Sequence, residues 1–242
     1  MHHQDLAISV KNMYKKFGDF MANDDLTFDV KKGEIFGFLG ANGAGKTTAM
    51  KILCGLSKPT SGDISIAGFD VYKQTEEIKK NIGYMSQKFS LYEDLTVGEN
   101  IQFYGGIYGL SSIEIKSRTK ELLAKIGMEG KEKLLIRDLP LGWKQKLAFS
   151  VAILHNPSIV FLDEPTGGVD PITRRQFWRQ IYEASEQGIT VFVTTHYMDE
   201  AEYCDRVTIM DKGKIVALDT PDELKRKYNV KNMFDLFLAI VR

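Results

Sequence analysis

Hydrophobic and polar residues alternate along the chain with two different periods. Short apolar runs predict strands over residues 6–10, 26–30, 34–39, 159–162, 190–194, 207–210 and 214–218. Helical patterns lie between several of these runs, over residues 49–54, after Asp170-Pro171 and after Thr220-Pro221. Because strands that alternate with helices are typical of a parallel sheet covered on both faces, the sequence predicts an α/β fold.

The middle of the chain has a different pattern. Thr96 with Glu99, and Ser111 with Glu114, have the spacing of capping boxes that open helices, and residues 95–155 as a whole predict helices. The strand pattern resumes at residue 158, so this block is expected to be an insertion and not a separate terminal domain. We therefore expect an α/β core with a β subdomain over residues 1–87 and 157–242, and a helical subdomain over residues 88–156.

Composition narrows the possible classes of function. The 242 residues are 43% hydrophobic and 26% charged, without the roughly 18 to 20 consecutive apolar residues that cross a bilayer. Lys plus Arg number 32 and Asp plus Glu 32, so the zero net charge argues against a dedicated nucleic-acid binder. Cys54 and Cys204 form neither a CxxC motif nor a cluster with histidine, which favours a reducing, cytosolic setting.

A glycine-rich segment directly follows the buried strand predicted at 34–39. It matches the pattern GxxxxGK[ST], in which backbone N–H groups wrap phosphates, the lysine neutralises them and the hydroxyl faces Mg²⁺ at a helix N-terminus. The strand before it and the helix after it are the context that this mechanism demands. The nucleotide-binding residues predicted here are Gly40, Ala41, Asn42, Gly43, Ala44, Gly45, Lys46, Thr47 and Thr48.

Two acidic residues, Asp163 and Glu164, end the apolar run at 159–162. A buried parallel strand would deliver them to the carboxyl edge of the sheet, where ligands of open α/β sheets bind. Asp163 is then placed to hold a metal ion through water, and Glu164 to orient or deprotonate an attacking water. Taken without the glycine-rich loop, the same pair could be a solvated strand end.

The order of the motifs identifies a family. The chain contains no DxxG or NKxD motif, which makes a GTPase unlike it, and a small kinase would need neither the second acid nor the helical insertion. The succession of motifs resembles the ATP-binding cassette (ABC) family over essentially the whole chain. These motifs are Phe17, GANGAGKTT, Gln87, LPLGW at 139–143, FLDEP at 161–165, GVD at 168–170 and Thr195-His196. GLSKPTSGDISIAGFDV, LTVGEN and THYMDEAEYCDR further resemble the ATPase subunits of ABC-2 type exporters, including multidrug exporters.

The resemblance implies a fold and an activity. The fold would be a P-loop NTPase (RecA-like) core with an antiparallel β subdomain and an inserted α-helical subdomain. The chain would bind ATP and Mg²⁺, form a homo- or heterodimer of cassettes, and hydrolyse ATP to energise a separate ABC-2 type transmembrane subunit. It would be cytoplasmic and peripheral on the membrane, without a nucleic-acid partner.

The resemblance also assigns roles to single residues. Phe17 lies 23 residues before Gly40 and matches the aromatic residue that stacks on adenine, with Tyr14 as the alternative. Gln87 matches the glutamine that touches Mg²⁺ and the water, on a loop that faces the membrane subunit. Thr47, Gln87 and Asp163 would thus serve the metal ion.

Three further residues take roles in hydrolysis and assembly. Glu164 would be the general base, and His196, one residue past a predicted strand, would sense the γ-phosphate. Asp170 matches the last residue of the D-loop, although an Asp before Pro171 is also a good helix N-cap.

The sequence departs from the family pattern at the signature motif LSGGQ, which caps ATP bound to the opposite subunit. Pro140 replaces the serine and removes a hydroxyl and an N–H group, and Leu141 replaces a glycine, while Gly142 is retained and Trp143 follows. This departure leaves open whether the chain completes a partner's ATP site.

Two other functions stay open at this point. One is a soluble ABC-type ATPase that acts on nucleic acid or ribosomes, which the single cassette and the 55-residue spacing from Gln87 to Gly142 do not favour. The other is a weakly hydrolysing assembly module with a degenerate signature. The retained Lys46, Asp163 and Glu164 argue against it. The sequence does not name a transported substrate, because that selectivity would lie in membrane subunits.

Overall fold

The computed structural model describes residues 5–87 and 91–241. The first part of the chain forms a four-stranded antiparallel sheet of order β2-β1-β4-β5. A tight turn at Gly18-Asp19 joins β1 to β2, which lets two strands of equal length pair from the turn onward. The strands are β1 (Leu6–Phe17), β2 (Phe20–Lys31), β4 (Ser61–Ile66) and β5 (Phe69–Asp70).

A second sheet of six strands has the order β10-β9-β3-β8-β7-β6. The pairs β9–β3, β3–β8, β8–β7 and β7–β6 are parallel, and the edge strand β10 is antiparallel to β9. Every residue of the three central strands β3, β8 and β7 is buried. The strands are β3 (Ile35–Gly40), β6 (Ile82–Met85), β7 (Ile159–Asp163), β8 (Thr190–Thr195), β9 (Arg206–Asp211) and β10 (Lys214–Asp219).

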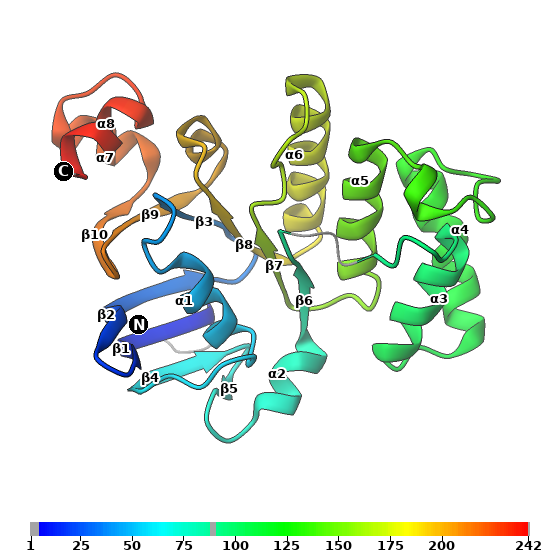
Figure 1. Ribbon diagram of the computed structural model, residues 1–242, viewed down its shortest axis with the longest axis horizontal. Coiled ribbons are helices and arrows are strands. Elements are labelled where there is room, and N and C mark those ends of the chain that lie inside the picture. The colour runs from blue at the N-terminus through cyan, green and yellow to red at the C-terminus, as the bar shows by residue number, and fades with distance from the viewer. Residues whose placement is uncertain (1–4, 88–90, 242) are drawn as a thin grey trace.

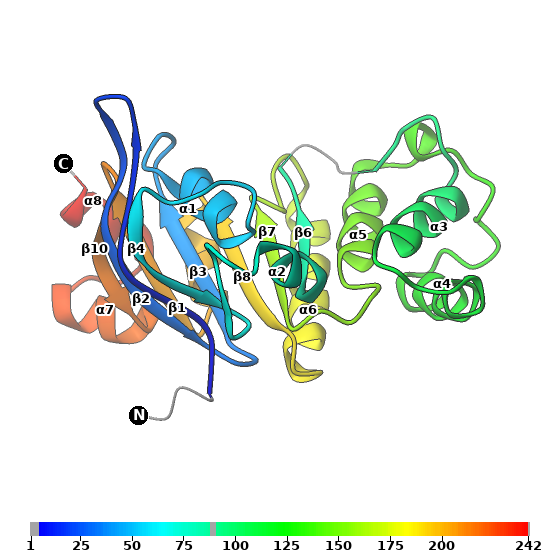
Figure 2. The same cartoon turned by 90° about the horizontal axis from the view of Figure 1, so that it is seen from below.

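One hydrophobic core fills the space between the two sheets. It contains helix α1 (Lys46–Leu53) together with apolar residues of β1, β2, β3 and β7. Phe28 of β2 stacks on Phe36 of β3 with ring centroids 5.7 Å apart, and Phe38 contacts Phe192 at 5.1 Å. The antiparallel sheet therefore covers one face of the parallel sheet and encloses α1 (Figures 1 and 2).

A second core covers the other face of the parallel sheet. Helix α6 (Pro171–Glu186) packs there, with Phe177, Trp178 and Ile181 buried, and α5 (Leu141–Ala152) lies beside it. Helices α3 (Val97–Ile107) and α4 (Ser112–Ile126) continue from α5 to the far end of the molecule (Figures 1 and 2). The two capping boxes predicted at Thr96 and Ser111 are both present and open these two helices.

The middle block is less uniformly helical than predicted. A long irregular segment separates α4 from α5 and contains only the short 3₁₀ helix η2 (Ile136–Asp138). Gly127 ends α4 in the left-handed conformation at φ 72°, and the chain then has to return past α3, which a continuous helix would not allow. The predicted subdomain boundary at residue 88 falls on residues 88–90, which lie outside the described residues.

The C-terminal part of the chain completes the second core. The 3₁₀ helix η3 (Met198–Tyr203) follows β8, and the helices α7 (Pro221–Tyr228) and α8 (Met233–Ile240) follow β10. The remaining helix, α2 (Thr75–Asn81), lies between β5 and β6 in the sequence, and its Ile78 belongs to the first core. Met233 and Leu236 of α8 are buried against the core, whereas Phe234 and Leu238 are exposed. Among the described residues, no helix combines the length and the hydropathy that crossing a bilayer requires.

The α/β architecture predicted from the sequence is thus confirmed. One predicted element, the helix α1, has different bounds in the structure. The sequence placed that helix over residues 49–54, but it begins at Lys46 inside the glycine-rich loop. The left-handed Gly45, at φ 100°, serves as its N-cap, so the helical turn forms as soon as the loop has reversed the chain.

The close packing of β6 against α5 generates a stability prediction. A Cβ atom added at Gly83 would lie 2.1 Å from the backbone oxygen of Ala152, so Gly83→Ala forces the two elements apart. We expect the free energy of unfolding to fall by roughly 1–3 kcal/mol, as measured by urea denaturation. Gly106→Ala is the matched control, since nothing lies within 4 Å of its Cβ position in α3. Equal stability of the two variants would contradict this packing.

Candidate functional site

The glycine-rich loop connects β3 to α1 at the carboxyl edge of the parallel sheet. A Cβ atom at Gly45 would lie 2.4 Å from the Ala22 backbone oxygen, so only glycine allows the loop to lie against β2. Gly45 gives α1 no side-chain cap. The free N–H groups of the first turn therefore point to where an anion can bind, at the positive end of the helix dipole.

Lys46 lies at the centre of this loop and is only 5% exposed. Its Nζ atom donates hydrogen bonds to the backbone oxygens of Gly40 (2.7 Å) and Ala41 (3.2 Å). Burial lowers the pKa of Lys46, and the nearby carboxylates of Glu164 and Asp163 oppose this shift. The two carbonyls hold the ammonium group inside the curve of the loop, where a phosphate would meet it.

Asp163 is the last residue of β7 and is 5% exposed. Its Oδ1 atom accepts a hydrogen bond from the Thr194 hydroxyl of the neighbouring strand at 2.7 Å. Burial raises the pKa of Asp163, and that hydrogen bond acts in the opposite direction. The register of β7 beside β8 thus fixes one oxygen of the carboxylate and leaves the other to a ligand.

Glu164 is the point at which the other predicted residues meet. Its Oε2 atom accepts a hydrogen bond from Gln87 Nε2 at 2.9 Å and lies 2.9 Å from Nδ1 of His196. Its Oε1 atom is 3.8 Å from Nζ of Lys46. Residues from three separate segments therefore converge on the carboxylate of a fourth.

The backbone of Glu164 is also held firmly. Its N–H group donates to both the backbone oxygen and the hydroxyl of Thr194, each at 3.1 Å, and its φ of 47° lies in the left-handed region. A non-glycine residue with this conformation is uncommon, and such residues cluster at functional sites. The turn aims the side chain back over the end of the sheet.

A pocket of about 450 Å³ opens over these groups. Eight of its ten lining residues are site residues predicted from the sequence, and the other two belong to β2. The lining residues are Phe20, Ala22, Asn42, Gly43, Gly45, Lys46, Thr47, Thr48, Gln87 and Glu164. Gly40, Ala41 and His196 line a second, adjoining pocket of about 390 Å³ together with residues of η3 and α8.

The aromatic position differs in detail from the expectation. Phe17 pairs with Phe20 across the β1–β2 turn, and both rings are exposed, at 55% and 66%. The ring that lines the pocket is that of Phe20, whereas Phe17 lies under the ammonium of Lys15 at 4.7 Å. Tyr14 is farther along β1, where burial and then Asp25 raise its pKa. Both phenylalanines thus stand at the hairpin end beside the pocket.

The signature segment lies outside this pocket. Leu141 begins α5 and is 38% exposed, Pro140 is its N-cap without a side-chain hydrogen bond, and the Trp143 ring lies under Lys131 at 4.1 Å. Gly142 packs closely on Thr173. A Cβ atom added at Gly142 would lie 2.6 Å from Thr173 Cγ2. Among the described residues that line the pocket none belongs to this segment.

Asp170 lies at the start of α6 as an N-cap. Its Oδ1 atom accepts hydrogen bonds from the N–H groups of Ile172 (2.9 Å) and Thr173 (3.0 Å), as the sequence predicted for the Asp-Pro pair. The Thr173 hydroxyl lowers the pKa of Asp170 most, followed by the backbone hydrogen bond from the same residue.

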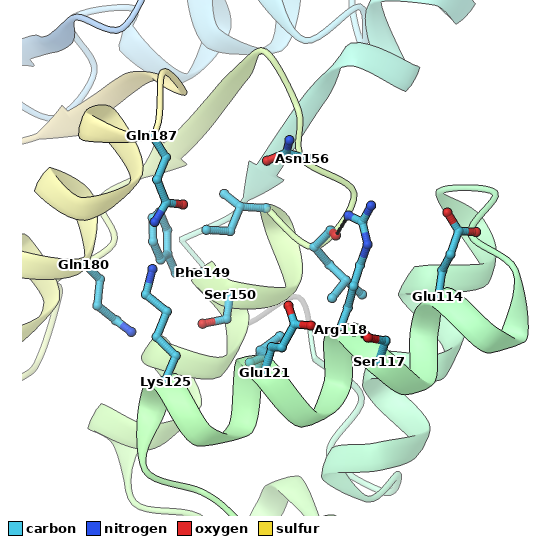
Figure 3. Close-up of a pocket in the computed structure, with 13 residues that line it drawn as sticks. Glu114, Ser117, Arg118, Glu121, Lys125, Phe149, Ser150, Asn156, Gln180 and Gln187 are labelled. Atoms are coloured by element: carbon cyan, nitrogen blue, oxygen red, sulfur yellow. Dashed lines mark hydrogen bonds between the residues drawn. The ribbon is translucent and has the colours of Figure 1, made fainter.

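A separate pocket of about 480 Å³ lies between α4, α5 and α6 (Figure 3). Its charged side chains are Glu114, Arg118, Glu121 and Lys125 from α4. Arg118 donates to the backbone oxygen of Leu154 at 2.5 Å, which attaches α4 to the end of α5. Lys125 forms an ion pair with Glu183 of α6 at 3.3 Å. These contacts join the helices, and the nucleotide-binding residues predicted from the sequence lie elsewhere.

Sequence reasoning missed two residues next to the site. Thr194 looks like any residue of a buried strand, and only the register of β7 and β8 shows that it fixes both Asp163 and Glu164. Phe20 could have been suspected from the Gly-Asp turn between two strand patterns, because such a turn places the residues on both sides of it next to each other.

Comparisons with known proteins agree on one family. The family model described as "ABC transporter" matches residues 23–167. Over 219 residues the chain is 49% identical to the probable multidrug ABC transporter ATP-binding protein YbhF of Escherichia coli (strain K12), which covers 90% of this chain and 38% of that protein. The chain therefore spans less than half the length of this relative.

Other relatives are matched over most of their length. The chain is 37% identical over 218 residues to the linearmycin resistance ATP-binding protein LnrL of Bacillus subtilis (strain 168), covering 90% of this chain and 70% of that protein. A solved ATP-binding subunit of an ABC transporter has a TM-score of 0.87 at 30% identity, covering 97% of this chain and 99% of that one. A dimeric cassette, MJ0796, in a post-hydrolysis state with ADP and Pi has a TM-score of 0.78 at 27% identity, covering 88% and 98%.

The arrangement of Lys46 and the two aromatic rings predicts separate contributions to nucleotide affinity, one from phosphate binding and one from adenine stacking. Lys46→Ala should weaken the binding of both ATP and inorganic tripolyphosphate by at least about 10-fold in calorimetry, because it removes a charge-assisted phosphate contact. Phe17→Ala should weaken ATP alone, by the roughly 1–3 kcal/mol of a base–aromatic stack.

Phe20→Ala is the matched comparison for the adenine contact. Since its ring lines the pocket, a loss of ATP affinity in this variant with none in Phe17→Ala would assign the stacking ring to Phe20. If both variants bind ATP as the wild type does, the hairpin end has no contact with adenine.

Proposed function

Because the chain belongs to the ABC transporter family, we propose that it is an ATP-hydrolysing subunit that energises a separate membrane subunit, as an exporter. A family model that covers more than half of the chain establishes the membership. The observation that carries the proposed chemistry is the convergence of Gln87, His196 and Lys46 on the Glu164 carboxylate.

Each residue has a distinct part in the reaction we propose. Lys46 and the N–H groups of the loop hold the phosphates and take up the charge that develops on them. Glu164 accepts a proton from the attacking water, for which its position at the end of a buried strand, 11% exposed, is suited. His196 contacts Glu164 through Nδ1 and is 36% exposed. When both ring nitrogens carry a proton, its Nε2–H group can donate to the γ-phosphate.

The donor set fits Mg²⁺. This ion prefers oxygen ligands, keeps several waters and is commonly bound through one or two carboxylates and substrate phosphates. Thr47 supplies a hydroxyl that lines the pocket, and Asp163 a carboxylate at the same sheet edge. Gln87 donates its NH₂ group to Glu164, so its carbonyl oxygen is the atom that would bind the ion. When bound, Mg²⁺ would neutralise charge on the phosphates.

We further propose that two cassettes enclose the nucleotide. The signature segment of this chain lies outside its own pocket, so any nucleotide that it caps would be bound to another cassette. The dimeric state of MJ0796 supports this arrangement for a cassette of the same fold. Whether the second cassette is a copy of this chain or a different one is the question that the altered signature raises.

The membrane subunit is expected to contact the region that follows Gln87. Tyr92 and Phe103 are 50% and 42% exposed there and pack edge to face, with ring centroids 5.0 Å apart. Exposed aromatic clusters of this kind are typical of protein interfaces. The names of the relatives, which include multidrug, linearmycin-resistance and daunorubicin-resistance proteins, support export by an ABC-2 type partner, with this chain on the cytoplasmic face of the membrane.

The two alternative functions have less support. Relatives such as YbhF, LnrL and the Nod factor export ATP-binding protein I are named for transport, resistance or export, which does not favour an ATPase that acts on nucleic acid or ribosomes. An assembly module that hydrolyses ATP weakly or not at all has no need of an acid with a strained backbone next to Lys46. Hydrolysis itself decides between the proposed function and this alternative.

Glu164→Gln should separate binding from hydrolysis. The amide preserves the shape of the side chain and lacks the basicity, so we expect unchanged ATP affinity and a turnover lower by about 10² to 10⁴. ATP-dependent dimers should then accumulate in size-exclusion chromatography. Glu121→Gln, in the pocket between α4 and α6, is the control and should hydrolyse at the wild-type rate. Near-normal turnover in Glu164→Gln would exclude this residue as the base.

The altered signature should make the chain a poor cap for a partner's ATP. Losing one hydroxyl contact to a charged phosphate costs roughly 1.5–3 kcal/mol, and the exposed Leu141 obstructs close approach. The isolated chain should therefore hydrolyse ATP slowly, and faster with a cassette of intact signature or with the cognate membrane subunit. Pro140→Ser with Leu141→Gly should tighten the ATP-driven dimer of the Glu164→Gln background. Weaker dimerisation would show that LPLGW is a working signature.

A further inference from the structure

A carboxylate outside the pocket is more deeply buried than Asp163 and Glu164 of the site. Glu200 lies in η3, four residues after His196, and is 0% exposed. Its Oε2 atom accepts a hydrogen bond from the Thr195 hydroxyl at 2.6 Å, and its Oε1 atom accepts one from the Thr166 hydroxyl. The nearest cation, Nε of Arg174 in α6, is 3.6 Å from Oε1.

The cost of this arrangement suggests that stability is not its purpose. Removing a carboxylate from water costs several kcal/mol, and an ion pair recovers that amount only with very good geometry. Here the charge is balanced by one cation at a long distance and by two hydroxyls. A hydrophobic side chain of similar volume would fill the same space at lower cost, so the position of the two bonded hydroxyls is what Glu200 provides.

Both hydroxyls belong to segments that carry residues of the site. Thr195 directly precedes His196, and Thr166 comes two residues after Glu164. Thr195 also accepts a hydrogen bond from the N–H group of Tyr197 at 3.0 Å, which closes the backbone around His196. Glu200 therefore joins the segment of the histidine to the segment of the base from behind.

The surrounding side chains extend this connection to α6. The guanidinium of Arg174 lies over the Tyr197 ring at 4.4 Å, and that ring in turn contacts the His196 ring at 4.2 Å. Arg174 also forms an ion pair with Asp199 at 3.2 Å. The buried carboxylate, Arg174 and Tyr197 thus form one support on which the imidazole rests.

We propose that Glu200 is a positioning residue for ATP hydrolysis: by bonding Thr195 and Thr166 it holds the imidazole of His196 at hydrogen-bond distance from Glu164. This inference rests on the proposed function, because it assigns Glu200 a role in that same reaction. Within the described chain, the side-chain hydrogen bonds and the ion pair of Glu200 do not involve the glycine-rich loop, so its effect should fall on turnover and not on nucleotide binding.

Steady-state ATPase kinetics of the full chain test the proposal. Glu200→Gln keeps the shape but turns one acceptor oxygen into an NH₂ group, which cannot accept from a threonine hydroxyl. We expect kcat to fall by about 10-fold to 10²-fold, as small misplacements of a catalytic group do, with KM and the affinity for ATP changed by less than about twofold. Wild-type kcat in a folded Glu200→Gln variant would overturn the proposal.

Glu34 provides the matched control. It is another buried carboxylate, 7% exposed and ion-paired with Arg206, but it precedes β3, at the opposite end of the sheet from the glycine-rich loop. Glu34→Gln should lower the melting temperature and leave kcat unchanged. If Glu34→Gln and Glu200→Gln lower kcat equally, general destabilisation explains both, and the positioning role is excluded.

A double-mutant cycle shows whether Glu200 acts through His196. Groups that act as one unit are non-additive, so Glu200→Gln should cost nothing further in a His196→Ala background. Multiplied losses would overturn the proposal. If Glu200→Gln does not fold, Thr166→Val removes the same bond and should lower kcat, while Thr166→Ser restores the hydroxyl and the rate. Equal rates for the two would also overturn it.

The ATPase rate of the wild type distinguishes failure of the proposed function from failure of the role of Glu200. A wild-type chain that binds ATP and does not hydrolyse it, alone or with its membrane subunit, would contradict the proposed function itself. A wild type that hydrolyses ATP as fast as its folded Glu200→Gln variant would contradict only the role of Glu200.

Discussion

Burial of β3, β7 and β8 on both faces is the constraint on which the rest of the structure depends. Every residue of these three strands is excluded from water, so their side chains have to be apolar or hydrogen-bonded within the sheet. Charged groups can appear only where the strands end. Because the strands are parallel, their carboxyl ends meet at one edge. The glycine-rich loop, the two acids and the histidine are adjacent for this reason.

The same burial sets the electrostatics of that edge. It raises the pKa of Asp163 and lowers the pKa of Lys46, so each group loses part of the hydration that favours its charged form. Their opposite charges, and Glu164 at 3.8 Å from the ammonium, compensate for part of this loss. A site of this kind gains from a ligand that brings both anionic phosphate and a cation, since each finds an unhydrated partner of opposite charge.

Local chemistry was the predictable part of this molecule. The capping boxes at Thr96 and Ser111 and the Asp170 N-cap depend on residues within one turn of a helix, and the structure contains them as predicted. The glycine-rich loop was predictable because phosphate binding requires this spacing of glycines, lysine and threonine within one short segment. Contacts between distant segments were not predictable in this way. Glu200 and Thr166 are 34 positions apart, and only the folded chain shows that they are bonded.

The helix that carries the altered signature is connected to the segment of the proposed base, Glu164. Gln145 of α5, 2% exposed, donates to the backbone oxygen of Gly167 at 3.3 Å, and Gly142 packs on Thr173 of α6. The N–H group of Gly167 in turn donates to the backbone oxygen of Glu164 at 3.2 Å. A displacement of α5 therefore acts on the segment that holds Glu164. If the signature serves a partner's nucleotide, as the proposed dimer requires, closure at the partner's site and the position of the base in this chain are mechanically joined through these contacts.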